Sequence, residues 1–199
     1  MKIIITAFLV FFYFALNAQN NTAYTNTIKA YQKNYTTTHE VVKGKNRTFF
    51  RFYPATEKFK VSCRFQRSSD SSIVVMTTSG KKIPQKDFMR YGKLYFTIND
   101  TALELTVYQS QIKNVLTKDY LFLPFTDLTT GDETYGSGRY IDLLVSAIKK
   151  DTVVIDFNKA YNPYCAYSNN FNCPLPPREN YLPVTITAGE KTFAKILAH

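Results

Sequence analysis

Alternation of apolar and polar residues is the feature that most constrains the fold of this chain. From Thr48 onward the pattern has a period of two, and the clearest segment is Phe59-Lys-Val-Ser-Cys-Arg-Phe-Gln66. Residues Leu94 to Ile98 and Leu103 to Val107 repeat it, with apolar side chains on one face and polar partners on the other. This period is typical of half-buried β-strands, in which successive side chains point to opposite faces.

The spacing of these segments predicts a mainly β protein. Turn signals such as Ser79-Gly80, Asn99-Asp100 and Gly189-Glu190 separate them, and short strands joined by tight turns favour an antiparallel β-sandwich or a partly open barrel. We expect strands over Thr48–Tyr53, Lys58–Gln66, Ser72–Thr78, Lys93–Ile98, Ala102–Gln109, Tyr120–Phe125, Thr152–Phe157, Val184–Ala188 and Thr192–Ile196.

Three regions follow one another along the chain. Residues 1–18 resemble a signal peptide, residues 19–47 form a polar segment, and residues 48–199 are expected to fold as a single β-rich domain. Within the polar segment, Thr22 to Tyr35 has the spacing of one short amphipathic helix. Tyr140–Lys149 is the other segment that competes as a helix.

The N-terminus indicates export. Lys2 precedes an apolar run from Ile3 to Leu16, and Ala18 offers a small residue for cleavage. This run is shorter than the roughly 20 residues that a membrane-spanning helix needs. We therefore expect a cleaved secretory signal, no transmembrane segment in the mature chain, and a bacterial protein of the periplasm or the extracellular space.

The charge of the chain favours a solvated basic surface over a dedicated polyanion site. The net charge is +10, but the basic residues are spread along the chain without a long block. A basic excess of this kind favours contact with anionic surfaces in general. Nucleic acid is not expected as the normal partner of an exported protein.

Three cysteines suggest one disulfide pair and one spare thiol. Cys63 lies on the apolar face of its strand and is expected in the core. Cys165 and Cys173 lie eight residues apart across a loop, and a bridge there would contribute on the order of 2–3 kcal/mol. Thiol or metal chemistry, or two unpaired structural thiols, are the alternatives.

Histidine content argues against two common kinds of site. His39 and His199 are the only histidines, so neither a His-rich zinc site nor a Ser-His or Cys-His pair is expected. Asp127, Asp132 and Glu133 lack the ligand repeat of a calcium loop. The sequence therefore predicts no metal site and requires no cofactor.

A run of loop-forming and hydrogen-bonding residues between Pro124 and Glu190 is where we expect a site. The glycines that flank Arg139 either form an anion-receptive loop or supply positive φ in a tight connection. Tyr161, Tyr164 and Tyr167 either line a groove or pack the loop. The candidate ligand-binding residues are Arg139, Asp127, Glu133, Tyr135, Tyr140, Asp156, Asn158, Asn162, Glu179 and Asn180.

Several motifs in this run resemble a bacterial family, domain-of-unknown-function family 1684. They are Pro124-Phe-Thr-Asp127, Thr134-Tyr-Gly136, Gly138-Arg-Tyr140, Asp156-Phe-Asn158, Ala160-Tyr-Asn-Pro163, Cys173-Pro-Leu-Pro-Pro177, Glu179-Asn180 and Ala188-Gly-Glu190. The resemblance implies a shared architecture and a shared site region, and it implies no particular reaction.

Three functions fit these residues. The preferred one is binding of a small anionic or carbohydrate-like ligand in a polar loop pocket, with Arg139 as the charge clamp and Tyr135 and Tyr140 as walls. The alternative is a hydrolase that uses a pair among Asp156, Glu179 and Glu133. A third is a structural module that interacts with the cell envelope, with no ligand. Whether the protein is an enzyme, and its oligomeric state, stay open.

Overall fold

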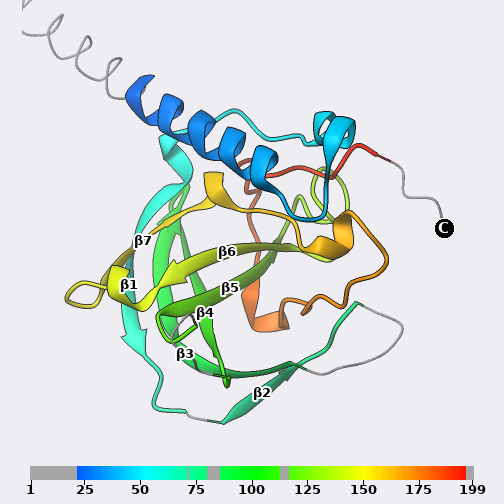
Figure 1. Cartoon of the computed structure of the whole chain (residues 1–199). Helices are drawn as coiled ribbons and strands as arrows, with labels where there is room; N and C mark the ends of the chain where they lie inside the picture. Colours follow the sequence, from blue (N-terminus) through cyan, green and yellow to red (C-terminus); the bar gives the residue numbers. More distant parts are fainter. Residues whose placement is uncertain (1–21, 71, 80–85, 113–116, 196–199) are drawn as a thin grey trace, which may run out of the picture.

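The computed structural model describes residues 22–70, 72–79, 86–112 and 117–195. In this part of the chain, eight strands form one sheet that curls into a half-barrel, and a helix over residues 22–38 lies across one end of it (Figure 1). The main path of the sheet is β6-β5-β4-β3-β1-β7, with β2 paired to β3 and β8 paired to β5. The mainly β prediction with one N-terminal helix is therefore confirmed, in its partly open form.

The bounds of the elements are as follows. The strands are β1 (Lys60–Arg67), β2 (Ile73–Met76), β3 (Lys86–Ile98), β4 (Thr101–Ser110), β5 (Tyr120–Asp127), β6 (Arg139–Leu144), β7 (Thr152–Asp156) and β8 (Tyr181–Leu182). The short 3-10 turns are η1 (Gly44–Phe49), η2 (Glu57–Phe59), η3 (Val145–Ala147), η4 (Phe157–Lys159), η5 (Tyr164–Ala166) and η6 (Arg178–Asn180). The expected signal peptide, residues 1–18, lies outside the described residues.

Most strands fall where the alternation predicts them, and β6 is the exception that matters for the site. Tyr140–Lys149 was the second helical candidate, but residues 139–144 form β6. β6 pairs antiparallel with β5 from Tyr120↔Leu144 to Phe125↔Arg139. The ladder to β5 supplies the backbone hydrogen bonds that a helix would otherwise form, so tertiary pairing overrides the local pattern.

Three predicted strands are wrong or incomplete. Thr48–Tyr53 begins within η1 and makes only the isolated bridge Phe52↔Glu190. Val184–Ala188 and the described part of Thr192–Ile196 form no strand. In the former, the carbonyls of Ile186 and Ala188 accept hydrogen bonds from the Arg139 side chain. A side chain thus takes the place of a neighbouring strand.

A tight turn and one glycine within a strand shape the sheet. Asn99 and Asp100 have φ of +49° and +61°, as the central residues of a tight β3–β4 hairpin require. The β3–β4 register shifts between Arg90 and Gly92. A Cβ at Gly92 would lie 2.4 Å from the Phe65 ring and 2.6 Å from the Gln66 carbonyl oxygen, so this close approach of β3 to β1 needs glycine.

The core lies inside the curl of the sheet. Leu94, Leu105, Leu121, Leu123 and Ile155 are fully buried there, and burial of each such side chain stabilises the fold by roughly 1.5–3 kcal/mol. The N-terminal helix docks on this body through apolar and hydrogen-bonded side chains. Its Ile28 is fully buried, and its Tyr24 hydroxyl donates to Asp156 Oδ1 over 3.0 Å.

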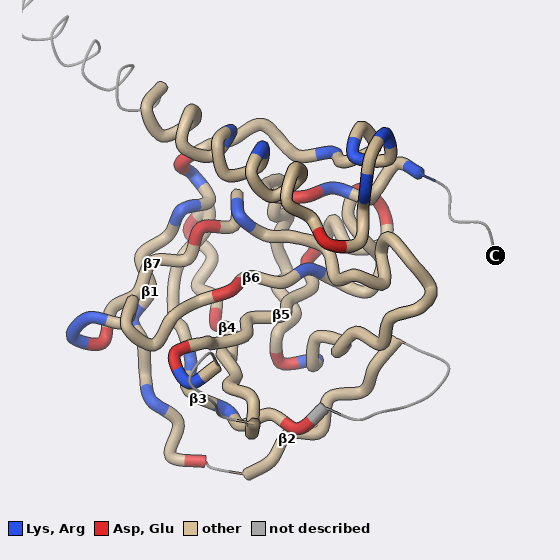
Figure 2. The backbone as a smooth tube through the Cα atoms, in the orientation of Figure 1, with Lys and Arg blue, Asp and Glu red and all other residues tan. Residues whose placement is uncertain are grey.

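Basic and acidic positions are interspersed along the backbone (Figure 2). Several cations on the outer surface of the sheet stack on tyrosines. Arg67 lies 3.5 Å from the Tyr91 ring centre, and Arg64 lies 4.2 Å from that of Tyr95. Among the described residues, no helix has the length and apolar character needed to cross a bilayer.

Candidate functional site

Arg139, expected to clamp an anion, is fully buried in the structure. Its Nη2 donates to Asp127 Oδ2 over 2.8 Å and to the Ile186 carbonyl over 3.0 Å. Its Nη1 donates to the carbonyls of Ala188 (2.5 Å) and Glu190 (3.3 Å). Both carboxylate and guanidinium have 0% side-chain exposure. These contacts explain Arg139 without a ligand, because they join the start of β6 to residues 186–190.

The glycine before Arg139 makes this placement possible. Gly138 has φ of +85°, and a Cβ on it would lie 2.6 Å from the Phe125 carbonyl oxygen. Of the two interpretations of the glycines around Arg139, this geometry favours the tight connection. Asp127 also accepts hydrogen bonds from Thr129 N (2.8 Å) and Thr129 Oγ1 (2.7 Å). The carboxylate therefore orders the loop that follows β5.

Asn158 and Asn180, predicted to contact a ligand, also bind backbone groups. Asn180 Oδ1 accepts from Thr106 N, and its Nδ2 donates to the Thr106 and Pro124 carbonyls, over 2.6–2.8 Å. It therefore bridges β4 and β5. Asn158 does the same for Thr56, accepting from its N over 3.0 Å and donating to its carbonyl over 2.9 Å.

The carboxylates considered for hydrolysis lie in separate surroundings. Asp156 Oδ1 accepts from Tyr24 Oη. Glu133 pairs with Lys191 over 2.9 Å, and Glu179 pairs with Arg90 over 3.1 Å and accepts from the Tyr108 hydroxyl. Among the described residues, no hydrogen-bonding partner is shared between any two of these three carboxylates. Tyr135 packs against the cluster of Val42, Ala166, Tyr167 and Phe193.

The backbone N–H of Asn162 donates to Glu190, a buried carboxylate that was not among the predicted site residues. Glu190 is fully buried, and its carboxylate accepts from Asn162 N (2.9 Å), Tyr167 Oη (2.7 Å) and Tyr35 Oη (3.2 Å). No described cation pairs with it. Burial raises the pKa of Glu190 to about 7, although these hydrogen bonds oppose the rise. Its place in the Ala188-Gly-Glu190 motif was the available signal.

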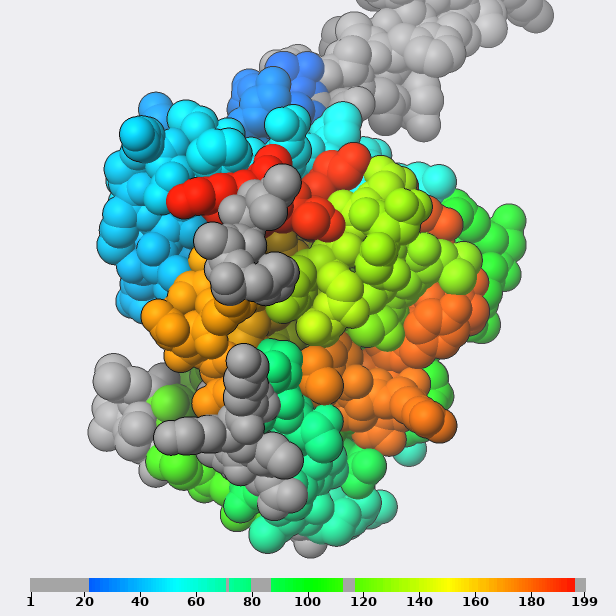
Figure 3. All heavy atoms as spheres, turned by 90° about the vertical axis from the view of Figure 1, so that its right-hand side faces the viewer, coloured from blue at the N-terminus to red at the C-terminus, as the bar shows by residue number. Residues whose placement is uncertain are grey.

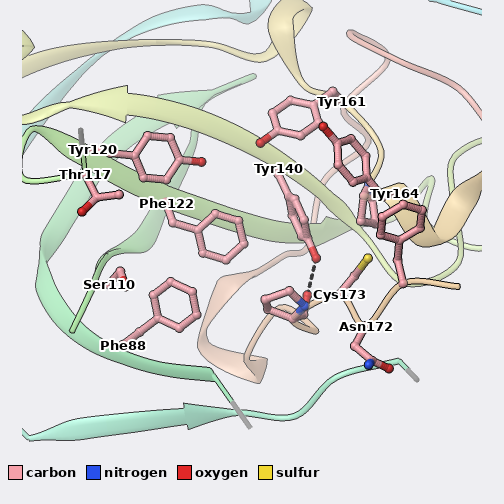
Figure 4. Close-up of a pocket in the computed structure, with 13 residues that line it drawn as sticks. Phe88, Ser110, Thr117, Tyr120, Phe122, Tyr140, Tyr161, Tyr164, Asn172 and Cys173 are labelled. Atoms are coloured by element: carbon pink, nitrogen blue, oxygen red, sulfur yellow. Dashed lines mark hydrogen bonds between the residues drawn. The ribbon is translucent and has the colours of Figure 1, made fainter. Parts of the chain in front are cut away.

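A cavity of about 430 Å³ opens between the sheet and the loop of residues 161–174. One wall comes from β3, β4, β5 and β6, through Phe88, Ser110, Tyr120, Phe122 and Tyr140 (Figure 4). The other wall and the rim are formed by Thr117, Tyr161, Pro163, Tyr164, Phe171, Asn172, Cys173 and Pro174. Of the predicted ligand-binding residues, only Tyr140 lines this cavity.

The aromatic rings of the sheet wall form a continuous row. Phe88 stacks on Phe122 with 5.2 Å between ring centres, and Phe122 meets the edge of Tyr140 at 4.7 Å. Tyr140 contacts Tyr161 at 5.9 Å. The Tyr140 hydroxyl donates to the Pro174 carbonyl, which anchors the loop to β6 (Figure 4). Rings fixed in this way present flat apolar surfaces to the cavity.

One carboxylate borders this aromatic cavity. Asp142 Oδ1 accepts from Tyr120 Oη (2.5 Å) and Tyr161 Oη (2.6 Å), both of which belong to cavity-lining residues. Burial and the charge of Asp142 raise the pKa of both tyrosines, so both hydroxyls stay protonated. The described residues that line the cavity include no Lys or Arg.

The predicted cysteine pair lies at the rim. Cys165 and Cys173 form a disulfide with 2.32 Å between their sulfur atoms, and Cys63 is a free, buried thiol.

On the face in Figure 3, the loop that carries this disulfide lies below the C-terminal segment. That segment is held by Lys191 N donating to the Arg51 carbonyl (2.9 Å) and Thr192 N donating to that of Glu133 (3.0 Å).

The fold and the cavity define a class of protein: a β half-barrel with an aromatic cavity between its sheet and one loop. Within that class, the chain belongs to the DUF1684 family, described as a protein of unknown function, whose model matches residues 46–191. The family resemblance inferred from the motifs is therefore confirmed. The N-terminal helix lies outside the matched residues.

A solved structure shares this fold. It is the solution NMR structure of the uncharacterized protein from gene locus rrnAC0354 of Haloarcula marismortui, which is 26% identical, with a TM-score of 0.64. The match covers 84% of this chain and 93% of that one. No curated protein matches the chain.

A sequence signal for the cavity existed in β5. Leu121, Leu123 and Phe125 face the core, while Tyr120 and Phe122 face the cavity. Its apolar run therefore has no polar face, which is the pattern of a strand covered on both sides. Because we expected one polar face on each strand, we did not predict that the second face of β5 lines a cavity.

Proposed function

We propose that this protein binds a small, uncharged, ring-bearing ligand in the aromatic cavity. The observation that carries this proposal is the row of Phe88, Phe122, Tyr140 and Tyr161 along a cavity of about 430 Å³. Ligand sites are typically concave, about 300–1,000 Å³ in volume, and mostly apolar with a few placed polar groups. Here the hydroxyls of Tyr120 and Tyr161, which donate to Asp142, belong to lining residues and supply those polar groups.

The charges around the cavity favour the carbohydrate-like alternative over the anionic one. An anion bound there would lie near Asp142, with no Lys or Arg among the described lining residues to compensate its charge. The two terminal nitrogens of Arg139, the expected clamp, are already bonded to Asp127 and three carbonyls, and the side chain is fully buried. We therefore place the ligand in the aromatic cavity rather than among the loop carboxylates.

We also propose that the protein works outside the cytoplasm, in the periplasm or beyond the cell. The signal-like sequence of residues 1–18 and the Cys165–Cys173 disulfide support this, since disulfides persist in oxidising compartments. Expression with the native N-terminus, fractionation and sequencing of the mature N-terminus test it. A protein that starts at Gln19 in the exported fraction is expected, and an uncleaved cytoplasmic chain would contradict the proposal.

Titration calorimetry tests the binding site with a matched pair of bicyclic probes. We expect the neutral 2-naphthol to bind about tenfold more tightly than the anionic 2-naphthoate, a difference of about 1.4 kcal/mol. In Ser110→Trp, an indole placed on the cavity wall should remove naphthol binding.

Thr97→Trp is the control, because Thr97 is exposed on β3 and does not line the cavity. It should bind naphthol as the wild type does. Equal naphthol binding by the wild type and Ser110→Trp, or tighter binding of naphthoate, would contradict the proposed site.

A further inference from the structure

Two tyrosine hydroxyls of the aromatic cavity, those of Tyr120 and Tyr161, share one carboxylate oxygen. Tyr120 Oη donates to Asp142 Oδ1 over 2.5 Å, and Tyr161 Oη donates to the same oxygen over 2.6 Å. A carboxylate only accepts and a phenol has a single proton, so each hydroxyl has only lone pairs left to offer. Because linked hydrogen bonds polarise one another, donation to a carboxylate makes each hydroxyl oxygen a better acceptor.

This hydroxyl pair lies where a bound molecule can meet it. Tyr120 and Tyr161 both line the cavity, and both are half-buried rather than sealed in the core. Figure 4 shows their hydroxyls pointing toward each other, above the rings of Phe122 and Tyr140. Asp142 is not among the described lining residues, so a ligand in the cavity meets the hydroxyl oxygens first and not the carboxylate.

The other tyrosine hydroxyls of the described lining have committed their protons in the same way. The Tyr140 hydroxyl donates to the Pro174 carbonyl, and the Tyr164 hydroxyl donates to Glu40 Oε2 over 2.9 Å. Both residues line the cavity. The four tyrosines of the described lining therefore bring apolar rings and acceptor oxygens to the cavity, and none of them has a proton left for a ligand.

The remaining polar side chains of the described lining are those of Ser110, Thr117 and Asn172. Thr117 Oγ1 donates to a backbone carbonyl over 2.9 Å. Ser110 and Asn172 lie apart from the hydroxyl pair in Figure 4. The part of the cavity around the hydroxyl pair therefore offers acceptors, next to the apolar faces of the aromatic row.

We infer that the ligand is a neutral planar molecule of the phenol or indole class, and that Tyr120 and Tyr161 select it by accepting from the O–H or N–H on its edge. Its ring lies against the aromatic row while its donor meets the hydroxyl pair. A ring that carries only acceptors would set lone pair against lone pair and leave both unpaired. A sugar would place most of its hydroxyls against phenyl rings. The inference rests on the proposed function, because it names the ligand class of that site.

Titration calorimetry with indole and benzofuran tests the inference, because the two molecules share a shape and the N–H of indole is replaced by an oxygen in benzofuran. The wild type should bind indole about tenfold more tightly than benzofuran. The double variant Tyr120→Phe, Tyr161→Phe keeps both rings and removes both hydroxyl oxygens. Its preference for indole should fall to about twofold or less, with benzofuran binding nearly unchanged.

Tyr95→Phe is the matched control, because Tyr95 lies on the outer surface of the sheet under Arg64 and is not among the described lining residues. It should keep the preference of the wild type. A preference for indole that survives in the double variant would overturn the role of Tyr120 and Tyr161, because the donor would then be bound elsewhere.

Binding of 2-naphthol separates failure of this inference from failure of the proposed function. If 2-naphthol binds in the cavity and the wild type binds indole no more tightly than benzofuran, the selection of a donor is wrong and the proposed function stands. If 2-naphthol, indole and benzofuran all fail to bind, the proposed function and the inference are both overturned.

Discussion

At the scale of single residues, Arg139 shows how a functional-looking motif is used to hold the fold. Its guanidinium binds one carboxylate and three backbone carbonyls in a region from which solvent is excluded. Truncation of one member of such a buried pair leaves the other charged and unpaired. The motif around Arg139 therefore has an architectural role in this chain.

Arg139→Ala should lower the free energy of unfolding by about 3–5 kcal/mol, the range for a broken buried ion pair. Urea denaturation measures the loss. Lys191→Ala breaks the exposed pair with Glu133 and should change stability little, since exposed pairs contribute little. An Arg139→Ala protein as stable as the Lys191→Ala control would contradict the architectural role.

Glu190 makes stability depend on pH in a way that one variant isolates. Its folded pKa, about 7, lies above the ordinary value of 4.5. The folded state therefore holds a proton that the unfolded state releases between pH 4.5 and 7, and this contribution to stability falls as pH rises through that window. The whole shift corresponds to about 3 kcal/mol, from the two pKa values and 1.36 kcal/mol per unit.

Glu190→Gln stays neutral, so its stability relative to the wild type should increase between pH 4.5 and 7 and level off above. Urea denaturation of both proteins across this range measures the difference, and subtraction removes the contribution of His39, whose pKa is shifted in the opposite direction. A difference that is constant across the range would show that Glu190 titrates normally.

At the scale of elements, the N-terminal helix is part of the body of the protein. Ile28 is buried, Tyr24 binds Asp156, and Tyr35 reaches Glu190. The spacing of its apolar residues predicted the helix. Its hydrogen bonds to Asp156 and Glu190 could not be predicted, because these partners lie far away in the sequence.

Ile28→Ala should cost about 2–5 kcal/mol, the range for truncation of a buried aliphatic side chain. The exposed neighbour Asn26 provides the control, and Asn26→Ala should be close to the wild type in thermal unfolding. If the two variants unfold at the same temperature, the helix does not dock as described.

The loop between the two cysteines borders the aromatic cavity, and its disulfide has a direct chemical test. Titration of thiols in denaturant without reductant should find one free thiol per chain, Cys63. After reduction it should find three, the full cysteine content. Three free thiols in the unreduced protein from an oxidising compartment would rule out the bridge.

At the scale of the whole molecule, local pattern predicted the sheet far better than the site. Alternation located β1, β4 and β7, because each has one face in the core, and a continuous apolar run located β5. It failed at residues 184–188, where the partner of the backbone is the Arg139 side chain. No local pattern in those residues indicates a partner that lies far away in the sequence.

The aromatic cavity lies away from most of the predicted site residues for a related reason. The polar residues of the family motifs are buried where they hold loops, as Asn180 does between β4 and β5. The cavity is lined instead by aromatic residues, such as Phe88 and Phe122, that sequence alone assigns to the core. Tyr140 belongs both to the predicted ligand-binding residues and to the residues that line the cavity.

Two-dimensional NMR of the labelled wild-type protein during titration with 2-naphthol tests the central claim most directly. We expect the resonances of the lining residues to shift together and saturate, namely those of Phe88, Tyr120, Phe122, Tyr140 and Tyr161, while those of β7 at the far edge of the sheet do not move. Shifts centred on Arg139 and the loop carboxylates, or no saturating shift in the aromatic cavity, would contradict it.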